Sequence, residues 1–189
     1  AHNNPEKALN ESLKKLNTDY VDLYMIHWPM PQRNNTWKFL ERFLKEGKCK
    51  SIGVGNFTVR HLNELFKTAR VIPAVNQVEY NPYRQQKDVF KFCKSKNIVL
   101  VGYCPLTRGN KLDDPKLIKL SKKYSKTPAQ VLIRWALQNN IISIPKSRNP
   151  KRIEENFDVF DFNISKEDLE EMNSWNEDFI VTRDPEQLP

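Results

Sequence analysis

The sequence predicts an α/β fold in which helices cover a parallel sheet. Short apolar runs recur along the chain, and amphipathic stretches with helical spacing lie between them. Strands that alternate with helices pair as parallel neighbours, because each helix carries the chain back across the sheet. The chain has 189 residues, a length typical of one domain, and no linker or low-complexity stretch interrupts it. We therefore predict a single domain over residues 1–189.

The predicted strands are short runs rich in apolar residues. In chain order they cover residues 21–26, 51–54, 74–78, 98–103 and 141–144. Their lengths suit buried strands, and helical patterns rather than tight turns separate them. The order therefore predicts repeated strand–helix units.

The helices between these runs are predicted from apolar spacing and from start signals. Asn4 precedes Pro5, and Thr127 precedes Pro128, so a capping side chain is twice followed by proline at the first helical position. The apolar faces carry Ala8, Leu9, Leu13 and Leu16; Trp37, Leu40, Phe43 and Leu44; Leu62, Leu65 and Phe66; Val89, Phe90 and Phe92; and Val131, Leu132, Trp135 and Ala136. Both an open doubly wound sheet and a (β/α)₈ barrel fit this pattern, and periodicity does not choose between them.

Glycine usage limits the ways in which this chain can bind a nucleotide. There are 5 glycines, and neither a G-x-G-x-x-G nor a G-x-x-x-x-G-K pattern occurs. Those glycines let a backbone approach a pyrophosphate or cradle a phosphate. We therefore expect neither a Rossmann-type dinucleotide site nor a P-loop.

Composition and charge indicate a globular protein with a basic surface. Apolar residues make up 39% and charged residues 29%, which is typical of soluble domains. The net charge of +8 favours anions, and nucleic acid is one of them. Because the basic residues are scattered from Lys7 to Arg183 without a block or a known motif, we interpret them as a solvated surface. We expect no nucleic-acid partner.

Cysteine usage favours a reducing compartment. The 3 cysteines are an odd number and form no C-x-x-C pair, so neither a disulfide framework nor a metal site is expected. No apolar run approaches the ~20 residues of a membrane span. These features lead us to expect a cytoplasmic protein without a membrane partner.

Polar and special residues follow the ends of the predicted strands. They lie in the segments 26–29, 53–57, 76–83 and 102–106, and in 144–147 with its continuation to Arg152, Glu155 and Asn156. In a parallel β/α fold these ends form the ligand-binding face. Each segment alone has an ordinary structural explanation, such as a structural histidine or a helix cap.

Taken together, in this order and at these spacings, the segments resemble the aldo-keto reductase family from about Asn4 to Trp175. The most specific pieces are DLYMIHWP, GKCKSIGVGNF, NQVEYNPY and IPKSRNPKRIEENFDVFDF. The resemblance implies a TIM (β/α)₈-barrel type of fold that is incomplete here, with about strands 4–8 and their helices present. It also implies NADPH-dependent reduction of aldehydes or ketones to alcohols.

The resemblance assigns roles at the nicotinamide end of the cofactor. His27 matches the catalytic histidine, which hydrogen-bonds and orients the substrate carbonyl, and Trp28 would line the substrate pocket. Asn56 and Gln77 match the residues that hydrogen-bond the nicotinamide carboxamide, and Tyr103 matches the residue that stacks on the ring. The family usually has Ser before that Asn, whereas this chain has Gly55.

At the phosphate end, the resemblance assigns cofactor contacts to two later segments. The first consists of Cys104, Pro105 and Leu106, in which Cys104 stands where Ser is common and offers a weaker hydrogen bond near the pyrophosphate. In the second, cations and a hydroxyl at a helix start would hold the adenosine 2′-phosphate, which favours NADPH over NADH. The residues of this second segment are Lys146, Ser147, Arg148 and Arg152 for the phosphate, and Glu155 and Asn156 for the adenine.

The resemblance further implies that three of the family's four catalytic residues precede this chain. The family uses Asp, Tyr, Lys and His, and only the histidine has a match here, at His27. We therefore expect an N-terminally truncated chain whose full-length parent is a monomer acting on a small carbonyl substrate. Unpaired strand edges would make the truncated chain self-associate. The alternative function is that of a non-catalytic NADPH-binding or structural relative of the family.

Overall fold

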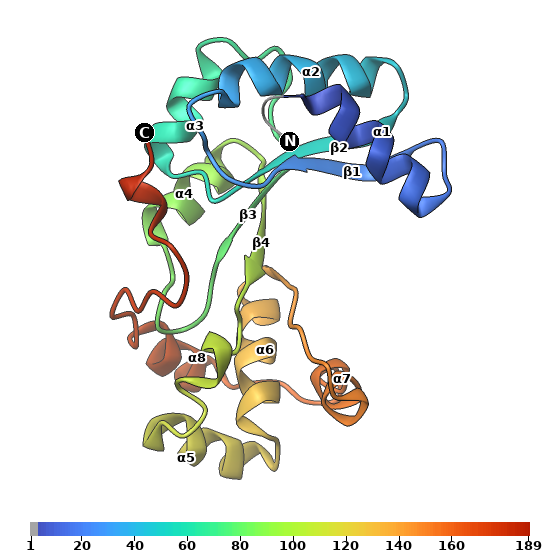
Figure 1. Ribbon diagram of the computed structural model, residues 1–189. Helices are drawn as coiled ribbons and strands as arrows, with labels where there is room; N and C mark the ends of the chain where they lie inside the picture. The colour runs from blue at the N-terminus through green and yellow to red at the C-terminus, as the bar shows by residue number, and fades with distance from the viewer. Residues whose placement is uncertain (1–3) are drawn as a thin grey trace. The chain divides into compact units, whose positions relative to one another are not determined.

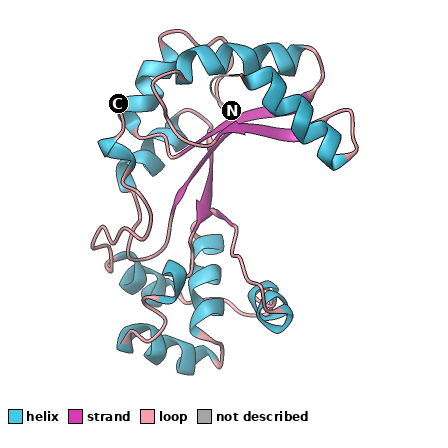
Figure 2. Cartoon of the chain, viewed as in Figure 1, coloured by secondary structure: helices cyan, strands magenta, loops and turns pink. Residues whose placement is uncertain are grey.

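A computed structural model describes residues 4–189 and contains the predicted alternation of strands and helices (Figures 1 and 2). The strands are β1 Val21–Ile26, β2 Cys49–Gly55, β3 Val75–Glu79, β4 Val99–Tyr103 and β5 Ile142–Ser143. The α-helices are α1 Pro5–Leu16, α2 Arg33–Lys45, α3 Val59–Phe66, α4 Lys87–Ser95, α5 Pro115–Tyr124, α6 Pro128–Gln138, α7 Pro150–Phe157 and α8 Lys166–Asn173. Two 3₁₀ turns, η1 Thr107–Gly109 and η2 Pro185–Gln187, complete the described elements. The α/β prediction is confirmed.

The five strands are hydrogen-bonded in chain order within one sheet. β1 runs parallel to β2, with Val21 opposite Cys49, and β2 runs parallel to β3, with Gly55 opposite Gln77. β4 and β5 are also parallel. The carboxyl ends of β1, β2 and β3 therefore lie at one edge, and those of β4 and β5 lie together as well.

Three predicted strands have different lengths in the structure, and one of them, predicted at 98–103, begins one residue later at Val99. The strand predicted at 51–54 extends over Cys49–Gly55, and the strand predicted at 141–144 shrinks to Ile142–Ser143. After that short strand, the Ile144 N–H still donates to the Gly102 carbonyl at 3.1 Å. Pro145 follows and has no N–H to donate, so the ladder ends there.

The described chain forms two compact units. Unit 1 contains residues 4–77, 88–99 and 184–189, and unit 2 contains residues 78–87 and 100–183. In unit 1, α2 packs against β1 and β2, and α1 packs on α2 (Figure 1). The core of unit 1 is formed by buried apolar side chains, among them Leu9, Trp37, Leu40, Phe43, Ile52, Leu62 and Leu65.

Unit 2 is organised around α6, which contacts α5, α7 and β5. The predicted start of this helix is confirmed, because the Thr127 hydroxyl accepts from the Gln130 N–H at 3.3 Å and the Gln130 side chain accepts from the Thr127 N–H at 2.9 Å. This reciprocal pair is a capping box. Further along α6, the buried Trp135 stacks on Tyr80 with ring centroids 5.2 Å apart. Among residues 4–189, no helix is long and apolar enough to cross a membrane.

Candidate active site

In unit 1, three predicted site residues are joined by hydrogen bonds at the ends of neighbouring strands. Asn56 follows β2 and is only 2% exposed. Its side-chain amide donates to the His27 carbonyl at 3.0 Å, and its backbone N–H donates to the Gln77 carbonyl at 2.8 Å. The His27 side chain is exposed, and its ring lies 6.1 Å from that of Trp28. We call His27, Asn56 and Gln77 the His27 cluster.

The backbone that carries Asn56 is unusual at two consecutive positions. Asn56 has a φ of 61°, a left-handed conformation that asparagine tolerates better than most residues. A Cβ atom at the preceding Gly55 would lie 2.8 Å from the His27 carbonyl oxygen. A side chain at position 55, such as the serine usual in the family, would therefore require these two chain segments to move apart.

In unit 2, most of the residues predicted to bind the phosphate end of a cofactor surround one cavity. Its volume is about 370 Å³. The lining consists of Leu106, Arg108, Gly109, Leu112, Ala129, Lys146, Ser147, Arg152, Glu155 and Asn156. Arg148, also predicted as a ligand, lies outside this lining. We call this space the cationic cavity.

The charges around the cationic cavity favour an anionic ligand. Arg108, Lys146 and Arg152 contribute positive charge, whereas Glu155 is the one carboxylate of the lining. Within residues 4–189, no salt bridge joins Lys146 or Arg152 to an acidic side chain. The helix α7 begins at this wall, and the positive end of its dipole adds to the same field.

Two further side-chain contacts order the walls of the cationic cavity. The Glu155 carboxylate accepts a hydrogen bond from the Thr127 hydroxyl at 2.6 Å, which fixes it to the start of α6. At the start of α7, the Asn149 side chain accepts from the Arg152 N–H at 3.4 Å. The cavity thus has a hydrogen-bonded frame from which cationic side chains project.

Arg108 is a lining residue that sequence reasoning missed. It lies in the turn η1 with a φ of 53°, a local geometry that apolar periodicity does not reveal. Burial raises the pKa of the nearby Cys104 thiol, while a hydrogen bond with Arg108 acts in the opposite direction. Of the residues between Cys104 and Arg108 in the sequence, Pro105 is buried and Leu106 lines the cavity. The only signal in the sequence is a cation two residues after the predicted segment 104–106.

Tyr103 ends β4, and its hydroxyl lies 3.0 Å from the Thr182 hydroxyl. The Thr182 hydroxyl donates in turn to the Glu79 carboxylate at 2.7 Å. Burial raises the pKa of Tyr103 above the usual 10.0. Neither Glu79 nor Thr182 was among the predicted site residues.

In residues 4–189 there is no group of three or more His, Cys, Asp or Glu side chains suited to a metal ion.

Comparison with known proteins identifies the family of this chain. Residues 1–177 match the model of the Aldo/keto reductase family, which includes the whole segment that carries the resemblance. The chain belongs to the aldo/keto reductase family. Curated members of this family that it resembles include the glyoxal reductase of Bacillus subtilis, 44% identical over 182 residues that cover 96% of this chain and 66% of the relative. The methylglyoxal reductase DkgA of Escherichia coli K12 is 42% identical over 192 residues, covering 99% of this chain and 70% of the relative.

Solved structures similar to this chain share its fold. An aldo-keto reductase named MGS-M4, from a Medee basin deep-sea metagenome library, superposes with a TM-score of 0.95 at 38% identity, covering 100% of this chain and 72% of that one. A point mutant of Gox0644 in complex with NADPH gives a TM-score of 0.94 at 42% identity, covering 98% and 70%. The chain thus spans roughly two thirds of the length of its curated relatives, 66% for the Bacillus subtilis enzyme.

Proposed function

We propose that the complete protein is an NADPH-dependent reductase that converts small aldehydes and ketones to alcohols. The observation that carries this proposal is the cationic cavity, in which three cations and the Ser147 hydroxyl face one carboxylate. This charge balance fits a phosphate dianion, because Arg, Lys and helix N–H groups are its usual partners. Family membership and the NADPH complex of the relative Gox0644 support the same cofactor.

The residues of the cationic cavity hold the adenosine end of the cofactor in this proposal. Lys146, Ser147 and Arg152 bind the 2′-phosphate, and Arg108 adds a cation to the same space. Glu155 and Asn156 contact the adenine. Cys104, Pro105 and Leu106 lie along the pyrophosphate. Arg148 is left out of the proposed set because it lies outside the cavity lining.

The His27 cluster and Tyr103 serve the reacting end. Asn56 and Gln77 hold the nicotinamide carboxamide, and Tyr103 stacks on the ring. His27 donates a hydrogen bond from a ring N–H to the substrate carbonyl. Trp28 covers the substrate beside it. When bound, NADPH supplies the hydride.

We place this chain at about strands 4–8 of a (β/α)₈ barrel, within a single NADP-dependent domain. The placement is supported by the motifs that follow β1 to β5, and by the greater length of the relatives. It is also supported by apolar side chains on the two outer strands of the sheet order, where Leu23 is 39% and Ile142 50% exposed. In this placement the family's catalytic Asp, Tyr and Lys belong to the strands that come earlier in the barrel.

The proposed substrate class is taken from the names of two relatives. The names of the Bacillus subtilis and Escherichia coli relatives state reduction of glyoxal and methylglyoxal, so we expect short 2-oxoaldehydes to be reduced here as well.

The test is a titration of the complete protein with NADPH and NADH, followed by tryptophan fluorescence, together with an assay on methylglyoxal. NADPH should bind more tightly than NADH and should be consumed when methylglyoxal is added. Binding without turnover of this or other small carbonyls would support the non-catalytic alternative instead. Equal affinity for the two cofactors would contradict the role of the cationic cavity.

A further inference from the structure

Glu79 is a buried carboxylate that the proposed reaction does not use. It ends β3 in unit 2, is 2% exposed, and forms no salt bridge within residues 4–189. Burying a charged group is costly unless hydrogen bonds compensate it. Its position is therefore expected to be set by the donors around it.

Those donors come from a segment more than a hundred residues further along the chain. The Val181 N–H donates to one Glu79 carboxylate oxygen at 3.0 Å, and the Thr182 hydroxyl donates to the other at 2.7 Å. The same segment is tied to the turn after β3, because the Glu177 and Phe179 N–H groups both donate to the Tyr83 carbonyl at 3.1 Å. These hydrogen bonds thus hold residues 177–182 of the C-terminal tail against Glu79 and the turn after β3.

The hydrogen bonds have only one consistent direction. A carboxylate accepts and cannot donate, and a threonine hydroxyl has one proton. Since the Thr182 proton is given to Glu79, its oxygen must accept from the Tyr103 hydroxyl, which lies 3.0 Å away. Tyr103, Thr182 and Glu79 therefore form a directed chain that ends on a negative charge.

We infer that Glu79 is a positioning residue that acts through Thr182 to orient the Tyr103 hydroxyl and ring against the nicotinamide. This inference rests on the proposed stacking role of Tyr103. It adds that the tail residue Thr182 belongs to the cofactor site through its contact with Tyr103.

These hydrogen bonds also predict that the protein binds one redox state of the cofactor more tightly than the other. A phenol that donates its proton towards a carboxylate has a more electron-rich ring. The oxidised nicotinamide carries a positive charge, and aromatic faces attract cations. Loss of the hydrogen bonds that join Tyr103, Thr182 and Glu79 should therefore weaken binding of NADP⁺ more than binding of NADPH.

The decisive variant is Thr182→Val in the complete protein. It removes the hydroxyl at nearly constant shape and leaves the Val181 N–H bond to Glu79 in place. We expect NADP⁺ to bind about fivefold to tenfold more weakly, because the hydrogen bonds of the Thr182 hydroxyl to Tyr103 and Glu79 are both lost. The ratio of NADP⁺ to NADPH affinity should fall by roughly twofold to fivefold. Thr182→Ser should restore both values.

A double-mutant cycle separates positioning from general stability. Tyr103→Phe keeps the ring and removes the hydroxyl, so Thr182→Val should have no further effect on cofactor affinity in that background. Thr18→Val serves as the control, since that exposed hydroxyl donates to the Tyr20 carbonyl at 3.1 Å, and it should leave affinity unchanged. Glu79→Gln should reproduce the affinity changes of Thr182→Val.

The outcomes distinguish this inference from the function on which it rests. If the unaltered protein binds NADPH and Thr182→Val binds both cofactors as the unaltered protein does, the inference is wrong and the proposed function stands. An equal effect of Thr182→Val with and without the Tyr103 hydroxyl would also overturn it, because the effect would then not pass through Tyr103. If the unaltered protein binds neither cofactor, the inference and the proposed function are both wrong.

Discussion

The cationic cavity of unit 2 and the His27 cluster of unit 1 are built in different ways. In the cavity, charged side chains project from a hydrogen-bonded frame, and Lys146 and Arg152 have no acidic partner within residues 4–189. In the His27 cluster, the contacts run largely through the backbone, because Asn56 bonds the carbonyls of His27 and Gln77. The cavity is thus suited to binding an anionic ligand through charge. The His27 cluster is suited to fixing the backbone that carries the His27 imidazole.

The largest expected effect tests the catalytic side of this comparison. His27→Gln in the complete protein should lower kcat/KM for methylglyoxal by about 10²–10⁴, the usual contribution of a positioned acid–base group. NADPH affinity should stay unchanged, because the imidazole does not contribute to the cationic cavity. Steady-state kinetics and fluorescence titration measure the two quantities. A loss of NADPH affinity as large as the loss of kcat/KM would show that His27 contributes to cofactor binding as well as to catalysis.

A smaller effect is expected on the binding side. Arg152→Ala should weaken NADPH binding about tenfold to a hundredfold, since a charged contact to a phosphate contributes ~1.5–3 kcal/mol. NADH lacks the 2′-phosphate, so its affinity should hardly change. Arg148→Ala is the matched control, because Arg148 lies in the same segment but outside the cavity lining. Equal losses for NADPH and NADH would mean that Arg152 supports the fold and not the phosphate.

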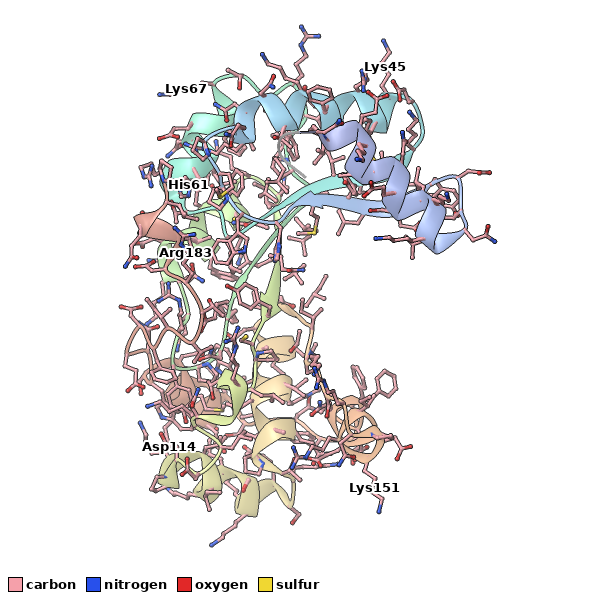
Figure 3. The ribbon with its side chains drawn as sticks, viewed as in Figure 1. Lys45, His61, Lys67, Asp114, Lys151 and Arg183 are labelled. Carbon is pink, nitrogen blue, oxygen red and sulfur yellow. The ribbon has the colours of Figure 1, made fainter. Side chains whose placement is uncertain are left out.

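The two units should also differ in their response to acid. His61 lies on α3 in unit 1 (Figure 3). Its side chain is fully buried, and this burial lowers its pKa below the usual 6.5. The unfolded chain then binds a proton that the folded chain does not, so stability falls as the pH drops below 6.5. In unit 2, burial raises the pKa of Asp168, but hydrogen bonds from Lys123 and Tyr124 outweigh it and hold the value below 3.8. That contribution is lost only as the pH falls below 3.8.

Thermal unfolding between about pH 7 and pH 5 tests this difference. The melting temperature should fall over this range in the unaltered protein and should fall less in His61→Gln. Asp168→Asn should lower the melting temperature but keep the slope of the unaltered protein. An unchanged slope in His61→Gln would remove His61 as the origin of the acid sensitivity.

The smallest effect on stability is expected on the outer face of α7. Phe157 is 75% exposed, and its ring lies 5.8 Å from that of Phe160. Phe157→Ser should change the free energy of unfolding of the 189-residue chain by no more than ~0.5 kcal/mol. It should nevertheless reduce self-association in sedimentation experiments, because exposed apolar patches promote association. Lys151→Ser, at an exposed position of the same helix, should leave the sedimentation profile unchanged.

Local features of the fold could be predicted from the sequence, whereas long-range contacts could not. The strand at 21–26 and the start of α6 at Pro128 were predicted at their observed positions, because alternating apolar runs and capping residues act locally. Lys146, Ser147 and Arg152 follow one strand and open one helix, so their meeting in one cavity could also be expected. Glu79 was missed because its partners Val181 and Thr182 lie 102 and 103 positions away. Arg108 was missed because a single left-handed turn decides where its side chain points.

Gly55 has a consequence for how this protein can diverge. Restoring the serine that the family usually carries would place a Cβ atom 2.8 Å from the His27 carbonyl oxygen, so the end of β1 would have to move first. That movement would displace the backbone of the residue proposed to orient the substrate. A single reversion would therefore be strained until the end of β1 had moved. The exposed Lys146 and Arg152, which line the cationic cavity, can by contrast change without moving a strand.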